Sequence, residues 1–249
     1  MTQLTSDHIK EFQTEGYTIL HEALSPAELT MLHDEADLLG DHVMNQGYDL
    51  VRHLGCIIEP LECGYLDPPR KGAAYYKIDM KAYQDRRDQL TPGVADFLMT
   101  TVSRWAGDLL HGPSTDRSLY LLNEQYIIKP PRTSTISQFA WHRDADYYQD
   151  KEWEKELTVA CWIALDDVDG DNGTVLIGSE GKGDDATQVK QIVEALAGSV
   201  VFMSSRLAHK STGNGSSHFR RAFMPQYSSR PFLDRTSSLP LALAIPIQF

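Results

Sequence analysis

The sequence predicts a mainly β protein with flanking α-helices, built as a jelly-roll or sandwich core with N-terminal helices packed outside it. Two observations lead to this fold class. From Ser118 onward, short runs rich in β-branched and aromatic residues alternate with Gly, Asp, Asn and Pro turns. Before that point the pattern is helical and loop-like. A chain of 249 residues also suits one undivided domain, residues 1–249.

Two helix starts are readable in the N-terminal part. Ser25 is expected to be an N-cap, with Pro26 in the first turn and Glu28 closing a capping box, so that the helix continues through ELTMLHDEADLLGDHVM. A second helix is expected after Thr91-Pro92, through VADFLMTTVSRWAGDLL. Between them, residues 45–80 form a long connection rich in Gly, Pro, Tyr and Cys, and loops of this length are often functional.

The β-rich half divides into separate runs. They read SLYLLNEQYIIK, ELTVACWIAL, GTVLIG, GSVVFMSS and RRAFMPQYSS, and each is bounded by turn residues. The apolar tail LPLALAIPIQF is expected to be either a core strand or a subunit-packing strand. A homodimer would follow from the second of these roles.

Charge and composition exclude several kinds of partner. A formal net charge of −12 argues against nucleic acid or an anionic membrane, and no apolar run approaches the roughly 18 residues of a membrane span. The polar, acidic N-terminus does not resemble a secretory signal, and three cysteines without a C-x-x-C pair suit a reducing compartment. We therefore expect a cytoplasmic protein in which any anionic cofactor needs a local Arg or Lys.

The stretch AWHRDADYY carries the first candidate metal ligands. His142 and Asp144 are two residues apart, and on a strand such side chains share one face while Arg143 points away. H-x-D alone is weak, because this spacing is common by chance. His209, at the end of the apolar run SVVFMSSRLA, is the preferred third ligand, with His218 as its competitor.

Two histidines and one carboxylate make the facial triad of non-haem Fe(II) oxygenases. Zinc is the alternative metal, but the chain has no H-E-x-x-H motif and no cysteine pair. A zinc hydrolase would need no dioxygen, which separates the two readings experimentally.

Several segments together resemble the phytanoyl-CoA hydroxylase-like (phytanoyl-CoA dioxygenase) family of Fe(II)/2-oxoglutarate-dependent oxygenases. The resemblance covers about residues 8–229 and rests on FQTEGYTIL, the strand with Gln125 and IIKPP, WHRD, CWIALDDVDGDNGTVLIGSE, GSVVFMSSRLAHKSTGN and FRRAF, in this order. It implies a double-stranded β-helix (jelly-roll, cupin-like) core. It also implies that His142, Asp144 and His209 form the catalytic iron centre, where dioxygen and 2-oxoglutarate are consumed to give succinate and CO₂.

The resemblance also implies residues that bind 2-oxoglutarate. Arg220 lies eleven residues after His209, at the place of the family's cosubstrate arginine. The planar guanidinium pairs with a carboxylate through two hydrogen bonds and stays charged when desolvated. Arg221 should face the other side of the strand. The resemblance adds Ser211, Trp162, Gln125 and Lys129, although Trp162 could equally be a core residue and Lys129 a solvated one.

The reaction expected by resemblance is oxidation of an unactivated C–H bond. Because Asp144 is present, where related halogenases lack the carboxylate, hydroxylation or oxidative cyclisation is expected rather than halogenation. We expect the substrate to be a small polar or glycosylated natural product. Two alternatives stay open, an acyl-CoA hydroxylase and a non-catalytic jelly-roll binding or sensor protein.

The substrate pocket is predicted to combine the 45–80 connection with the residues just past Asp144. Tyrosine offers a flat apolar face with a polar tip, which suits a ring-bearing or glycosylated substrate. The candidate contacts are His53, Tyr76, Asp146 and Tyr148, with Tyr65, Tyr75, Lys77 and Tyr147 beside them. An acyl-CoA would need several basic residues, and the connection offers only Arg52, Arg70, Lys71 and Lys77.

Overall fold

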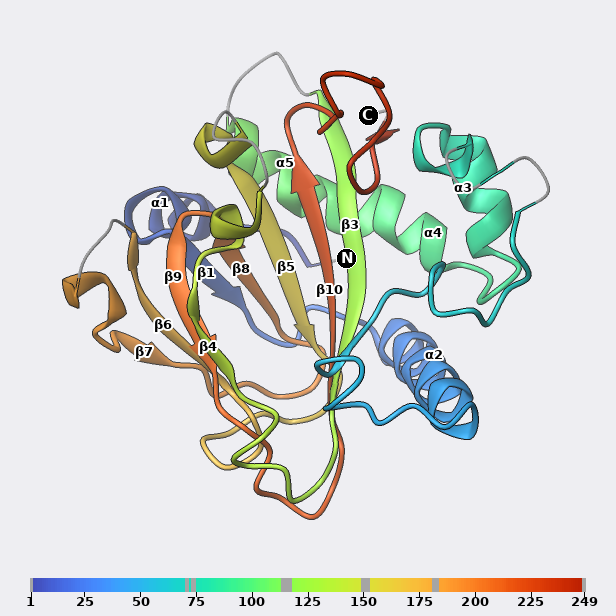
Figure 1. Ribbon diagram of the computed structural model, residues 1–249. Helices are drawn as coiled ribbons and strands as arrows, with labels where there is room; N and C mark the ends of the chain where they lie inside the picture. The colour runs from blue at the N-terminus through green and yellow to red at the C-terminus, as the bar shows by residue number, and fades with distance from the viewer. Residues whose placement is uncertain are drawn as a thin grey trace.

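Two antiparallel sheets face each other, and helices cover the outer face of the larger one (Figure 1). The computed structural model describes residues 2–69, 72, 75–112, 118–148, 153–180 and 184–247. The seven-stranded sheet has the order β1 (Tyr17–Leu20), β8 (Val200–Ser204), β5 (Thr158–Ala164), β10 (Arg220–Ser228), β3 (Leu119–Lys129) and β11 (Ile245–Ile247), with β2 (Ile57–Ile58) also paired to β3. The four-stranded sheet has the order β4 (Phe139–His142), β9 (Leu207–Ser211), β6 (Val175–Glu180) and β7 (Gln191–Ile192). This jelly-roll core with N-terminal helices confirms the predicted fold class.

The helices are α1 (Ser6–Glu15), α2 (Pro26–Asn45), α3 (Met80–Arg87), α4 (Val94–Asp96) and α5 (Ser103–His111), with a π-helical turn over Phe97–Val102. The Ser25–Glu28 capping box at the start of α2 is confirmed. The second helix begins at Val94, after Thr91-Pro92 as predicted, with Gly93 in a left-handed conformation (φ 93°) at its N-cap and no side-chain cap. Within the described residues, no helix is both long and apolar enough to cross a membrane.

The larger sheet separates two hydrophobic cores. Along β10, Phe223 and Tyr227 point into the core between sheet and helices, whereas Ala222 and Met224 point into the core between the two sheets. This alternation follows from the two-residue period of a strand. The space between the sheets is therefore the barrel interior, where the inward side chains of both sheets meet.

A β-bulge divides β3 into two halves. Gln226 of β10 pairs with Asn123, but the next residue, Tyr227, pairs with Leu121, so Leu122 is the extra residue of β3. A bulge reverses which residues face inward. On the C-terminal side of the bulge the even-numbered Tyr126 belongs to the helix-side core, whereas on the N-terminal side the odd-numbered Leu121 does.

The long connection and the apolar tail both add strands to the larger sheet. The connection was expected to lack regular structure, yet Ile57 and Ile58 pair with β3 as β2. The tail forms β11, which pairs with the other half of β3 in the same chain. The core-strand role of the tail is thus observed, and the homodimer stays a prediction.

A buried ion cluster joins the helical layer to β3. The guanidinium of Arg87 on α3 donates to Glu35 of α2 (2.8 Å from Nη1) and to both carboxylate oxygens of Glu124 on β3 (3.0 Å from Nε). Two tyrosine hydroxyls also donate into the cluster, Tyr83 to Glu124 at 2.7 Å and Tyr126 to Glu35 at 2.8 Å. All five side chains are buried, and no local pattern in the sequence indicates this cluster.

Replacement of Arg87 should strongly destabilise the fold. In Arg87→Met the volume is roughly kept, but two buried carboxylates lose their cation, which typically costs about 3–5 kcal/mol of unfolding free energy. Urea unfolding followed by circular dichroism measures the loss. The control is Lys81→Met on the same helix, where the partner Asp85 is exposed, and stability should stay unchanged. Equal stability of the two variants would contradict a structural role for the cluster.

Candidate metal centre

Three potential metal ligands converge inside the barrel. His142 ends β4 and pairs directly opposite His209 of β9, and their ring centroids lie 4.2 Å apart. Oδ1 of Asp144 lies 3.8 Å from Nε2 of His142 and 3.7 Å from Nε2 of His209. One ligand atom from each residue falls within 4.8 Å of the others. A single metal ion could therefore be held by all three.

The outer contacts of the three residues orient their ligand atoms. Nδ1 of His142 lies 2.8 Å from the Ala140 carbonyl oxygen, and Nδ1 of His209 lies 3.1 Å from that of Leu207. A histidine that donates through Nδ1 keeps the lone pair of Nε2 for a metal. Burial lowers the pKa of His209 against the opposing effect of Asp144, which favours the neutral ring that coordination requires.

The sequence predicts His142 and Asp144 on one strand, but the structure does not place them there. β4 ends at His142, and Asp144 opens the 3₁₀ turn Asp144–Tyr147. Two backbone N–H groups hold the turn, each at 3.0 Å: that of Ala145 donates to the Ser205 carbonyl oxygen, and that of Arg143 donates to the side-chain Oδ2 of Asp146. The carboxylate therefore reaches the histidines from a turn at the strand end.

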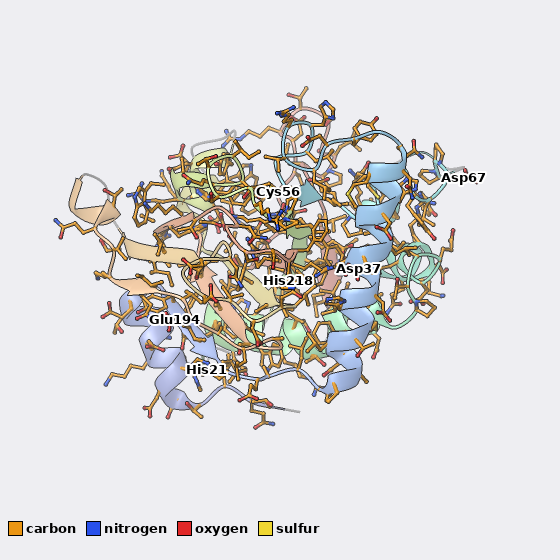
Figure 2. The ribbon with its side chains drawn as sticks, turned by 90° about the horizontal axis from the view of Figure 1, so that it is seen from below. His21, Asp37, Cys56, Asp67, Glu194 and His218 are labelled. Atoms are coloured by element: carbon orange, nitrogen blue, oxygen red, sulfur yellow. The ribbon has the colours of Figure 1, made fainter. Side chains whose placement is uncertain are left out.

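His218, the competing candidate for the third ligand, lies apart from the cluster. It is an exposed residue of the loop that leads from β9 into β10, and its Nδ1 is 3.2 Å from the Ser217 hydroxyl. In the view from below, His218 is labelled near the middle of the molecule (Figure 2). Of the two histidines, the structure brings only His209 to the pair of His142 and Asp144.

A cavity of about 600 Å³ adjoins the three ligands and collects most of the predicted cosubstrate residues. Arg220, Ser211, Trp162 and Gln125 all line it, and they come from β10, β9, β5 and β3. Lys129 lies immediately behind this wall, where it is completely buried and its Nζ donates to the Ser211 hydroxyl and the Thr212 carbonyl. Arg221 points the other way, as expected, and pairs with Asp37 and Asp166.

Arg220 and Lys129 form a buried positive region without an anionic partner among the described residues. Arg220 is 1% exposed, its guanidinium carbon lies 5.5 Å from the Trp162 ring centroid, and its Nε has no hydrogen-bond partner there. Burial lowers the pKa of Arg220 to about 10. Burial and, to a lesser extent, the charge of Arg220 lower the pKa of Lys129 to about 6. With a pKa near 6, Lys129 is mostly neutral near pH 7 without a ligand, so the buried charge lies mainly on Arg220. A buried cation without a partner is costly, and the region therefore suits an anionic ligand.

Gly173 keeps space open beside the side chains of Arg220 and Lys129. A Cβ at this position would lie 2.9 Å from Cδ of Lys129 and 3.4 Å from Nε of Arg220. The backbone of Gly173 also has a positive φ of 99°, which disfavours other residues. The donor set and this cradle together fit a metal ion with a small dicarboxylate beside it.

Only part of the predicted substrate pocket lies at the cavity. Tyr147 and Tyr148 line it, and the Tyr148 hydroxyl is 2.8 Å from that of Thr158. Asp146 is exposed and serves the turn described above. Tyr76 is buried against Glu62 (2.7 Å), and His53 lies on the surface with Nδ1 accepting from Asp49 N.

Among the described residues of the 45–80 connection, only Ile57 lines the cavity. Tyr65 instead packs against His42 of α2, and Lys77 pairs with Glu62. Tyr65, Tyr75 and Lys77 do not line the cavity. Arg70 and Lys71 lie outside the described residues. The described part of the connection therefore contributes one residue to the cavity and does not form the wall predicted from the sequence.

Several residues that line the cavity are not among those predicted from the sequence. Phe232 stacks on Trp153 with centroids 4.6 Å apart and meets Tyr148 edge-on at 5.1 Å, which makes an aromatic wall. No local pattern marks Trp153 or Phe232 as cavity residues. Gln226 could have been found, because it lies six residues after Arg220 on the same strand and so shares its inward face.

Known proteins share both the sequence pattern and the fold of this chain. A family model described as phytanoyl-CoA dioxygenase (PhyH) matches residues 12–222. No curated protein matches the chain significantly. Several solved structures share its fold.

Three of these structures indicate the range of relatives. SnoK, a non-heme alpha ketoglutarate dependent carbocyclase from nogalamycin biosynthesis, gives a TM-score of 0.59 at 18% identity over 92% of this chain and 85% of its own. The epimerase SnoN, in complex with Fe³⁺, alpha ketoglutarate and nogalamycin RO, gives 0.59 at 17% identity over 98% and 95%. EvdO2 from Micromonospora carbonacea var. aurantiaca, complexed with 2-oxoglutarate, gives 0.60 at 16% identity over 100% and 98%. At these identities the similarity shows a common fold.

Loss of His209 should abolish tight metal binding. In His209→Ala one of three ligands is missing, so the affinity for a divalent metal should fall by more than the roughly 10- to 100-fold that an outer-shell substitution costs. Anaerobic calorimetric titration of Fe(II) into metal-free protein measures it. The matched control is His218→Ala, which should bind like the unchanged protein. The assignment of ligands fails if the control loses affinity and His209→Ala does not.

Proposed function

The chain belongs to the phytanoyl-CoA dioxygenase family, and from this premise we propose that it is an iron(II)/2-oxoglutarate-dependent oxygenase that oxidises an unactivated C–H bond of a small polar or glycosylated natural product. Hydroxylation or oxidative cyclisation would be the outcome. The iron with its cosubstrate supplies the oxidising power, and succinate and CO₂ leave as co-products. The observation that carries the proposal is the single cavity that joins the His142–Asp144–His209 cluster to the buried Arg220.

We assign 2-oxoglutarate to the positive end of this cavity. The guanidinium of Arg220 would pair with one carboxylate, which would give the unpartnered Nε and its neighbours their acceptor. Ser211, held by Lys129, would offer a hydroxyl to the same carboxylate. Trp162 and Gln125 would form the walls of this end and exclude water. The space beside Gly173, described above, supports this location.

The chemistry of the remaining lining supports a neutral, hydroxyl-bearing substrate. Apart from the metal ligands and Arg220, the described lining side chains carry no charge. Amides and aromatic rings provide the polar and flat surfaces, which suit hydroxyl groups and the face of a ring. They are Asn123, Gln138 and Gln226, with Tyr147, Tyr148, Trp153 and Phe232.

Both alternatives from the sequence analysis are less well supported. The phosphates of an acyl-CoA would call for several basic residues near the cavity opening, and the described lining offers none apart from the deeply buried Arg220. A non-catalytic binding protein has no need for three convergent ligands beside a buried arginine. The similarity of the fold to SnoK, a carbocyclase of nogalamycin biosynthesis, adds support for a natural product as substrate.

Coupled turnover tests the proposed reaction. Protein reconstituted anaerobically with Fe(II) is mixed with 2-oxoglutarate, oxygen and a panel of glycosylated products, their aglycones and acyl-CoA esters. We expect succinate in proportion to an oxidised, neutral panel member, and none with His142→Ala. Turnover of acyl-CoA esters alone would overturn the substrate class. Activity with zinc in the absence of oxygen would overturn the oxygenase.

Removal of Arg220 should specifically weaken cosubstrate binding. Arg220→Ala takes away one partner of a buried charge pair, so 2-oxoglutarate should bind about 2–5 kcal/mol more weakly. Titration of 2-oxoglutarate into the Fe(II) protein, followed by its visible charge-transfer band, gives the affinity. Arg221→Ala is the control, since Arg221 faces Asp37 and Asp166 outside the cavity. A variant at Arg220 with unchanged cosubstrate affinity would show that another residue holds the carboxylate.

A further inference from the structure

The two oxygens of the Asp144 carboxylate have different surroundings. Oδ1 faces the histidines, at 3.8 Å from Nε2 of His142 and 3.7 Å from Nε2 of His209. Oδ2 instead accepts a hydrogen bond of 2.9 Å from Nε2 of Gln226. Among the described residues, Gln226 is the only side chain that donates to this carboxylate. One oxygen is thus available to a metal, and the other is occupied by an amide.

Gln226 is built into the barrel wall. The residue is 8% exposed and lines the cavity from the middle of the larger sheet. In the sheet it pairs with Asn123 of β3 on one side and with Ala160 of β5 on the other. The small Ala160 leaves lateral room for the glutamine, and the β3 bulge begins immediately after the pair with Asn123. The amide is therefore placed by the sheet and not by the mobile end of a loop.

We propose that Gln226 is a positioning residue that determines which oxygen of Asp144 meets the metal. An amide N–H bonded to Oδ2 stabilises the carboxylate in the orientation where Oδ1 faces the two histidines. It opposes a rotation that would bring both oxygens to the ion. Coordination through one oxygen keeps open the metal positions that a facial triad provides for its other ligands. Gln226 touches Asp144 and is not itself a ligand.

This inference rests on the metal site of the proposed function and is independent of the substrate. It concerns how the Asp144 carboxylate binds the metal. Without the amide donor, Asp144 is free to bind through both oxygens or to turn away. Either change alters the coordination sphere even when the fold is intact. Metal affinity and the ligand-field spectrum are therefore the appropriate measurements.

Co(II), a coloured substitute for Fe(II), tests the proposal without turnover. Gln226→Met keeps the length of the side chain but has no donor, and we expect its affinity for Co(II) to fall about 10- to 100-fold, the usual effect of losing an outer-shell partner. The visible d–d bands of the Co(II) protein should also shift. The matched control is Gln138→Met, because Gln138 is another cavity amide but donates to Ser134 O at 2.7 Å and not to Asp144.

The outcomes separate this inference from the proposed function. Gln226→Met with unchanged Co(II) affinity and unchanged bands would overturn the positioning role, provided that the wild-type protein binds Co(II). Equal losses in the Gln226 and Gln138 variants would also overturn it, since they would indicate a general effect of the cavity lining. Failure of the wild-type protein to bind Co(II) or Fe(II) would instead overturn the metal centre itself. Unfolding midpoints of the metal-free variants, measured in parallel, identify any loss due to misfolding.

Discussion

His142 and His209 owe their proximity to the antiparallel register of β4 against β9, in which they lie directly opposite each other. Side chains alternate between the faces of a strand, so a slip of one residue would turn His209 away from the barrel interior. The same register places Ser211 two residues further along, on the same face and within hydrogen-bonding reach of Lys129. One strand pairing therefore aligns the metal ligands with the positive end of the cavity.

The larger sheet has a buried charge system on each of its faces, and the two differ in how they are compensated. On the helical side, Arg87 is surrounded by two carboxylates and two tyrosines, and the cluster closes on itself. On the interior side, Arg220 and Lys129 have no such carboxylate among the described residues. In a chain of net charge −12, this is a strong local reversal of sign. The first system ties helices to the sheet, and the second is suited to a ligand.

Much of the site could be predicted from the sequence because its signals are local or ordered along the chain. H-x-D followed by a histidine after an apolar run indicated the ligands, and strand alternation separated Arg220 from Arg221. The position of the 45–80 connection could not be predicted, since it depends on side chains such as Tyr65 packing against distant helices. The aromatic wall was missed for the same reason, because Phe232 becomes a cavity residue only through its contact with Trp153.

Because of the bulge in β3, the two halves of this strand differ in which residues face the barrel interior. From Asn123 to Lys129 the odd-numbered residues turn inward, whereas before the extra residue Leu122 the odd-numbered Leu119 and Leu121 face the helices. Leu122 itself lines the cavity. Substitutions or single-residue insertions on the N-terminal side of the bulge would alter the cavity wall that a substrate contacts. The half of β3 that ends at Lys129 would keep its register with β10. Related chains could thus diverge in what they accept and still retain one way of handling their shared dicarboxylate.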